Sequence, residues 1–329
     1  KGSVNGNINI SVETSEYKVI DEVKIEDISY KEMFEWASYN LYFKSVDNLT
    51  CEEINFTERM LENIESKIGI EFHKEKYANE LIVCKFGNNN LVTAYKPLIF
   101  YSGLHVVKNM AYLYLKYYGF NFYSTNKSDI VYMYYIKPEC KNTLIFIHGL
   151  GFGITPYINF ILSLREETNI IIPIIPNISN MEFHGIFTEL TEEKLFPSYE
   201  TWRNDFRHII EEFNIKNIDI MGHSFGTIIM SIILRDDYIN NKIHRRIFVD
   251  PVCFFEKCYK LSNYLDNPDN GCVIDSIFNK IVYRDIYVGY TTQRFLFGPE
   301  FWIHDYSKIS KHDNLVILSE KDKIGRAHV

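Results

Sequence analysis

The spacing of apolar positions changes near residue 130, from helical periodicity before it to alternating strands and helices after it. Apolar residues recur every three to four positions over residues 30–41 and again over 60–68, the second run after a capping-type Thr57. This spacing predicts two amphipathic helices. Residues 81–86 and 91–95 flank a Gly-Asn-Asn-Asn turn sequence and predict a β-hairpin.

A third helix is predicted from Leu104 to Phe120, where the pattern is apolar around most of the helix circumference. Helices of this kind are usually buried. The alternative is a helix that lies on a membrane surface, because the segment is rich in Tyr and flanked by Lys. The sequence therefore leaves open a peripheral membrane contact through these residues.

Beyond residue 130, short apolar or β-branched runs bounded by breakers alternate with helical stretches. The clearest helix begins at the N-cap candidate Ser198 and places Trp202 and Phe206 on one face. Alternation of this kind predicts an α/β fold with a mostly parallel sheet and helices on both faces. The predicted strands are residues 130–136, 143–147, 169–174, 217–221, 246–249 and 314–318.

Composition excludes several classes of function. The 329 residues carry a net charge of −8 without a basic stripe, so no nucleic-acid partner is expected. The six cysteines lie far apart and form no metal-ligand spacing, so neither a metal nor a cofactor is expected. Scattered thiols slightly favour an intracellular protein, although the compartment stays open because an anchor segment upstream of Lys1 is not excluded.

The strongest chemical motif is Gly222-His223-Ser224-Phe225-Gly226, between a predicted strand and an apolar helix. Strand before and helix after are the context of a nucleophile elbow, which holds a serine in strained geometry at the edge of a sheet. Gly222 and Gly226 let the backbone pass closely, and Ser224 is the candidate nucleophile. The alternative is an ordinary tight turn.

A second motif, His148-Gly149-Leu150-Gly151, directly follows the predicted strand 143–147. With these two motifs the chain resembles the α/β-hydrolase superfamily over residues 130–322, and in detail a subgroup with a helical N-terminal extension. The resemblance implies that the amides of Leu150 and Phe225 form an oxyanion hole, with Gly149 and Gly151 as motif glycines.

The resemblance also places an acid after a late strand, which selects Asp322, with Asp250 as the alternative. The catalytic histidine is the departure from the pattern. His148 and His223 lie inside the two motifs, where structural roles are usual, and the remaining histidines have no matching setting. The base is therefore expected to be missing from a C-terminally truncated chain.

The final residues support the same expectation. The nucleotide sequence ATCGGAAGAGCACACGTC, part of a widely used sequencing adapter, translates in one frame to residues 324–329. Residues 323–329 are therefore predicted to be an adapter artefact, and the chain with this sequence is predicted to be inactive.

The resulting domain prediction has five parts. Residues 1–127 form the helical extension, 128–252 the first part of the hydrolase core, 253–310 a cap insertion, 311–322 a later core strand and 323–329 the artefact. The aromatic-rich cap predicts an apolar, lipid-like acyl substrate, unless its rings pack only with one another.

The predicted function is a serine hydrolase that cleaves an ester or related acyl bond of a small molecule through an acyl-enzyme. A peptidase or other hydrolase of this fold is the alternative within enzymes. A non-catalytic binding protein on the same fold is the alternative outside them.

Overall fold

The computed structural model describes residues 28–42, 44–73, 93–94, 96–125, 130–179, 197–254, 279–294, 303 and 313–319. Nearly all of the predicted hairpin, most of the predicted cap and residues 320–329 lie outside these ranges. The chain divides into two compact units, residues 1–89 with 297–299 and residues 90–296 with 300–329.

The first unit contains the two helices predicted from the N-terminal periodicity, and both are confirmed. They are joined by a short 3-10 turn, and the elements are α1 (Tyr30–Tyr42), η2 (Val46–Asn48) and α2 (Cys51–Ile68).

The start of α2 corrects the sequence prediction, because its cap is Thr50 and not Thr57. The Thr50 side chain accepts a hydrogen bond from the Glu53 amide, and the Glu53 carboxylate accepts one from the Thr50 amide at 2.8 Å. This reciprocal pair is a capping box. Thr57 is fully buried within the helix and donates its hydroxyl hydrogen bond to the Glu53 carbonyl.

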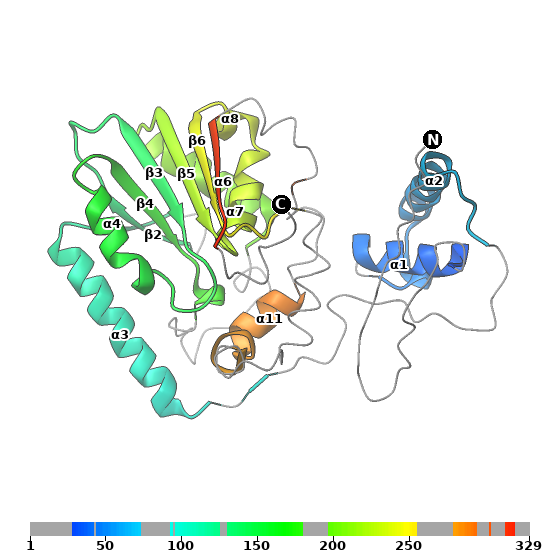
Figure 1. Ribbon diagram of the computed structural model, residues 1–329, viewed down its shortest axis with the longest axis horizontal. Coiled ribbons are helices and arrows are strands. Elements are labelled where there is room, and N and C mark those ends of the chain that lie inside the picture. Colours follow the sequence, from blue (N-terminus) through cyan, green and yellow to red (C-terminus); the bar gives the residue numbers. More distant parts are fainter. Residues whose placement is uncertain are drawn as a thin grey trace. The chain divides into compact units, whose positions relative to one another are not determined.

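The second unit is built on a seven-stranded sheet with the order β1-β2-β4-β3-β5-β6-β7 (Figure 1). The β1–β2 and β2–β4 pairs are antiparallel, and every pair from β4 to β7 is parallel. The strands are β1 (Asn121–Ser124), β2 (Val131–Tyr135), β3 (Asn142–Ile147), β4 (Asn169–Ile174), β5 (Asn217–His223), β6 (Ile243–Val249) and β7 (Asp313–Ile317).

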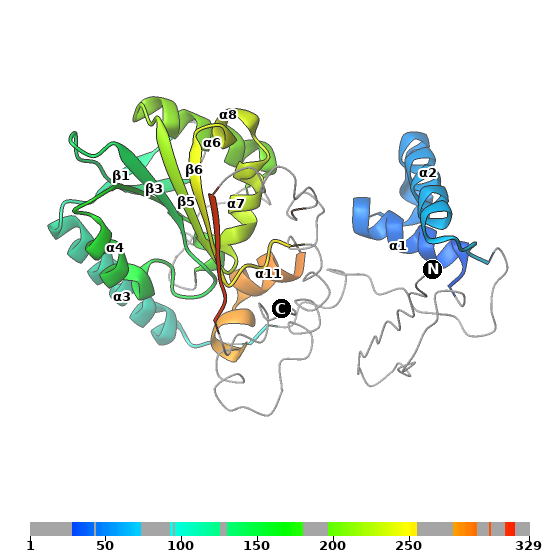
Figure 2. The ribbon, with the colours of Figure 1, turned by 45° about the horizontal axis from the view of Figure 1, so that its top comes forward.

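Helices cover both faces of this sheet, with α3 and α4 on one side and α6, α7 and α8 on the other (Figures 1 and 2). The helices are α3 (Leu98–Tyr117), α4 (Ile158–Leu164), α6 (Tyr199–Glu212), α7 (Gly226–Leu234), α8 (Asp237–Asn240) and α11 (Ile286–Arg294). Short helical turns are η3 (Thr155–Tyr157), η4 (Pro176–Ile178) and η6 (Asn279–Tyr283).

The fold class predicted from the sequence, an α/β-hydrolase fold with a mostly parallel sheet and helices on both faces, is confirmed. All six predicted strands are present, and Ser198 caps α6 by accepting from the Thr201 amide. The four-residue β1 was not predicted. It is short and largely exposed, so it lacks the apolar run that identifies the other strands.

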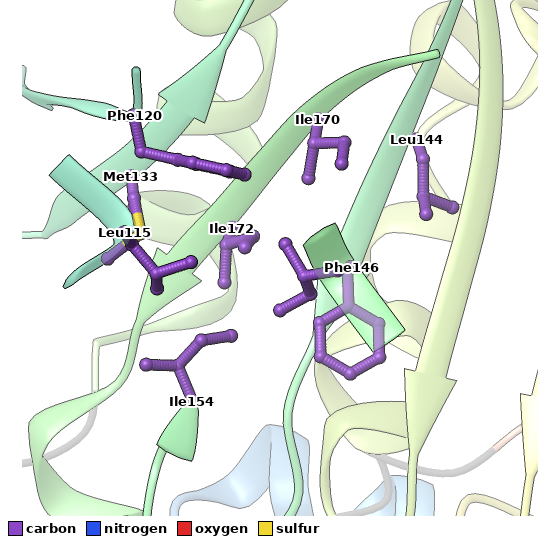
Figure 3. Packing of buried hydrophobic residues seen from close by; sticks show 9 residues of the cluster. Leu115, Phe120, Met133, Leu144, Phe146, Ile154, Ile170 and Ile172 are labelled. Atoms are coloured by element: carbon purple, nitrogen blue, oxygen red, sulfur yellow. The ribbon is translucent and has the colours of Figure 1, made fainter. Parts of the chain in front are cut away.

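Helix α3 packs on the sheet and belongs with it, whereas the sequence predicted a boundary after residue 127. Leu115 of α3 joins Phe120, Met133 and Ile172 in one buried cluster (Figure 3). The remaining members come from β3, β4 and α4 and from the loop before η3: Leu144, Phe146, Ile154, Ile161 and Ile170. Apolar periodicity identifies such a helix but does not say which unit it packs against.

Candidate active site

Three parallel strands bring the motif residues to one edge of the sheet. β3 and β5 pair in continuous register, and β5 and β6 do so from Asp219 to their carboxyl ends, after one register shift between Ile218 and Asp219. The residues that follow the carboxyl ends of the three strands therefore emerge side by side. These residues are His148, Ser224 and Asp250. In open α/β sheets, ligands bind outside the carboxyl ends of the strands, so this edge is the candidate active site.

Ser224 has the strained backbone that the elbow prediction requires. Its φ is 49°, in the left-handed region that residues other than glycine rarely adopt. This conformation costs about 1–3 kcal/mol, and hydrogen bonds of the Ser224 amide and carbonyl hold the residue in it. The Ser224 amide donates to the Val249 carbonyl at 2.8 Å, and the Ser224 carbonyl accepts from the Thr227 amide and hydroxyl at 3.0 and 2.7 Å.

The motif glycines are required by space. A Cβ at Gly226 would collide with the carbonyl oxygens of Ile147 and His148. A Cβ at Gly222 would lie 3.0 Å from backbone atoms of Gly226 and Thr227. The start of α7 therefore lies close to the end of β3 at Gly226 and close to β5 at Gly222. Only glycine permits both approaches.

The loop after β3 lies directly against the elbow. A Cβ at Gly149 would lie 3.2 Å from the Ser224 Cβ, and Gly151 has a φ of +114°. Leu150 stands between these two glycines, and Phe225 is the N-cap of α7. The structure thus brings both predicted oxyanion segments beside Ser224, at a helix N-terminus that favours negative charge.

The two motif histidines make contacts within the scaffold. The ring of His148 is buried, with Nδ1 2.9 Å from the Gly149 carbonyl and Nε2 3.4 Å from the Ile175 amide. His223 has Nδ1 2.7 Å from the Tyr157 hydroxyl and Nε2 3.9 Å from Asp250 Oδ2. These contacts agree with the structural roles expected for both.

Tyr157 is a residue of this site that the sequence reasoning missed. Its hydroxyl accepts a hydrogen bond from the Gly149 amide at 3.3 Å and contacts His223 Nδ1. Burial raises the pKa of Tyr157, so the hydroxyl keeps its proton at neutral pH and can donate it to Nδ1. Tyr157 therefore links the predicted oxyanion loop to the elbow. It follows no motif, and no sequence signal identifies it.

The two candidate acids differ in what the structure describes. Asp250 has a φ of 44°, and its Oδ1 accepts a hydrogen bond from the Ser319 amide at 2.6 Å. Its carboxylate thus holds the end of β7 while its Oδ2 faces His223. Asp322 lies outside the described residues. The choice between the two acids stays a prediction.

The described part of the predicted cap lies near the predicted oxyanion loop. A Cβ at Gly151 would meet the Val282 side chain of η6 at 3.6 Å. Of the thirteen cap aromatics seen in the sequence, the structure describes Phe254, Tyr283, Tyr287 and Tyr290, and the others lie outside its ranges. Tyr283 is buried, which favours the reading in which at least this ring packs within the protein.

Within the described ranges, no three His, Cys, Asp or Glu side chains are grouped so that they could hold a metal ion. The helices in those ranges include none that is long and apolar enough to cross a membrane.

Comparison with known proteins gives structural matches alone. Neither the family models nor the curated proteins contain a match to this chain. A hydrolase from Pseudomonas aeruginosa PA01 matches with a TM-score of 0.41 and 13% identity, covering 64% of this chain and 83% of that one. A 2-hydroxy-6-oxo-6-phenylhexa-2,4-dienoate hydrolase from Rhodococcus sp. strain RHA1 matches with 0.43 and 14%, covering 62% and 83%. A bacterial membrane phospholipase A matches with 0.43 and 14%, covering 69% and 80%.

Proposed function

We propose that this protein of the α/β-hydrolase fold is a serine hydrolase that cleaves an ester or related acyl bond through an acyl-enzyme. The observation that carries the proposal is the conformation of Ser224. A serine at φ 49°, fixed between the end of β5 and the start of α7, stores strain that a structural turn does not need.

The arrangement supports a two-step acyl transfer. Ser224 Oγ attacks the substrate carbonyl carbon, and the oxyanion that forms is stabilised by the amides of Leu150 and Phe225. The C–O bond to the leaving group then breaks, and the leaving alcohol takes up the proton that Ser224 lost. In the second step a water molecule attacks the acyl carbon, the carboxylic acid product leaves, and Ser224 Oγ regains a proton.

The proton carrier is not assigned to His148 or His223, because both ring nitrogens of each already face other groups. The proposed acid is Asp322, which would orient a histidine, and Asp250 is the alternative. The proposed substrate is an apolar acyl ester, because the segment between β6 and β7 carries thirteen aromatic residues.

A fluorophosphonate probe tests the proposal on the full-length protein. Wild type should be labelled, and Ser224→Ala should lose labelling and lower ester turnover by about 10³-fold or more. Ser163→Ala is the matched control, since Ser163 is an exposed serine of α4. Labelling that persists in Ser224→Ala would remove the assignment. A folded wild type that takes no label on any serine would support a binding protein.

A further inference from the structure

The outer face of α3 carries a continuous apolar stripe. Its members are spaced seven, four, three and four residues apart, so they lie along one side of the helix: Ile99, Val106, Met110, Leu113 and Tyr117. Met110, Leu113 and Tyr117 are exposed by 64, 66 and 84%. The residues that face the sheet, Ala111 and Leu115 among them, lie on the opposite side.

The stretch of sequence that carries this stripe contains no carboxylates. Of the 329 residues, 43 are Asp or Glu, yet residues 81–128 contain none and include five Lys. Lys116 is exposed on α3. At the C-terminal end of the helix, Arg165 stacks on Tyr118, and its neighbour Glu166 is paired with Lys137 at 2.8 Å. An acidic protein therefore has one long segment that an anionic surface does not repel.

Tyrosines end the stripe. Tyr114 and Tyr117 each pack against Tyr118, with ring centroids 4.9 and 5.4 Å apart. Tyrosine rings favour the boundary between hydrocarbon and headgroups, where the ring is apolar and the hydroxyl stays in contact with water. Aliphatic residues in the middle, tyrosines at one end and a lysine beside them are the pattern of a helix that lies in a membrane interface.

From these observations we propose that α3 docks the protein on an anionic lipid surface, with its stripe among the acyl chains and Lys116 near the headgroups. A protein partner would fit an apolar face equally well, but its binding would not require a segment free of carboxylates. Binding to anionic headgroups is favoured by such a segment, because carboxylates near the helix would repel the headgroups.

The docking face is tied to the candidate active site. Lys96, just before α3, pairs with Asp285 at 3.1 Å, and Tyr101 donates to the same carboxylate oxygen at 2.9 Å. Both side chains of the ion pair are nearly fully buried. Asp285 lies three residues after Val282, whose side chain is 3.6 Å from where a Cβ on Gly151 of the predicted oxyanion loop would lie. If Ser224 acts as proposed, its substrate would be an acyl lipid drawn from the surface that α3 contacts.

Vesicle flotation tests the docking surface directly. The full-length protein should float with vesicles of phosphatidylcholine and phosphatidylserine, and less with phosphatidylcholine alone. Met110→Ser with Leu113→Ser should weaken partition by about tenfold or more, since two buried side chains are lost. Lys116→Glu should weaken it on the anionic vesicles and make it less sensitive to salt.

The matched control is Phe56→Ser with Ile68→Ser, which removes from α2 two apolar residues that are exposed by 52 and 54%. It should float as wild type does. Ser224→Ala should also float normally, so a failure of docking is distinguished from a failure of the proposed chemistry. Wild type that stays unbound on anionic vesicles, or a control that loses binding equally, would overturn the proposal. A dimer that Met110→Ser with Leu113→Ser turns into a monomer would assign the face to a second copy instead.

Discussion

Helices α7 and α3 are both apolar, yet the protein uses them in opposite ways. All nine residues of α7 are buried, whereas most of α3 is exposed on its outer side. α7 follows strand β5 and packs against α6, α8 and β3. α3 packs with one side on the sheet near β2 and β4. Apolar composition therefore implies burial only where the fold supplies neighbours on every side.

The largest effect is expected at the start of α7. Gly226→Ala places a methyl group against the backbone carbonyls of Ile147 and His148, which cannot move without breaking the sheet. We expect a loss of about 4 kcal/mol or more in the free energy of unfolding, measured with urea. Gly103→Ala in α3 is the control, since nothing lies within 4 Å of that Cβ. It should gain about 0.5–1 kcal/mol. Equal results for the two variants would contradict the comparison.

The next effect concerns the contact that fixes the start of α3. Asp285→Asn leaves Lys96 charged and buried without its partner, at a cost of about 3–4 kcal/mol at pH 7. Lys31→Gln, in an exposed pair with Glu35, should change stability by about 0.5 kcal/mol or less.

The pH dependence of Asp285→Asn sharpens this prediction. Burial lowers the pKa of Lys96, and Asp285 opposes that shift. Between the folded pKa and 10.5 the unfolded chain binds more protons, so stability rises with pH. The variant lowers the folded pKa further, and its deficit should therefore shrink between pH 7 and 10. A deficit that is constant over this window would mean that Lys96 does not carry the loss.

A smaller difference is expected from paired truncations in the two helices. Ile232→Ala in α7 should cost about 2–3 kcal/mol, because it leaves a cavity among fully buried neighbours. Leu113→Ala on the outer face of α3 should cost about 0.5 kcal/mol or less. The two losses in the free energy of unfolding are measured with urea. Their ratio shows how much more a buried side chain of α7 contributes to stability than an exposed side chain of α3. A large loss at Leu113 would mean that the face is covered.

A modest gain in stability, opposite in sign to the losses at Gly226, Asp285 and Ile232, is expected at Arg246. Its guanidinium is fully buried on β6 and is held by Asn240 at 2.6 Å, while Nε and Nη1 have no hydrogen-bond partner among the residues that the structure describes. Burial lowers the pKa of Arg246 to about 10, so the cation persists at neutral pH. Arg246→Met should raise the free energy of unfolding by about 1 kcal/mol. A loss of stability in thermal denaturation would contradict this.

The features that could be predicted from the sequence are those fixed by short-range pattern. Alternating strands and helices predicted the sheet, and Ser198 marked the start of α6 because its side chain caps that helix locally. The Gly222-to-Gly226 motif predicted the elbow, since its glycines reflect contacts that any such turn must make. Thr57 shows the limit, because a threonine seven residues after the N-cap Thr50 resembles a cap in the sequence until the real cap is seen.

Other features depend on residues that are distant in the sequence. Tyr157 reaches His223 across 66 positions, and Lys96 reaches Asp285 across 189. No local periodicity encodes such pairs, because they exist only once the strands have been ordered and the loops brought to one edge of the sheet.

The sequence by itself therefore determined the α/β architecture, the elbow around Ser224 and the apolar character of α3, because each depends on neighbouring residues. Only the tertiary structure decided which side of α3 is covered, that α3 joins the sheet unit and that Asp250 supports the end of β7. These outcomes depend on which surfaces meet, and the free energy of burial belongs to the pair of surfaces and not to either segment alone.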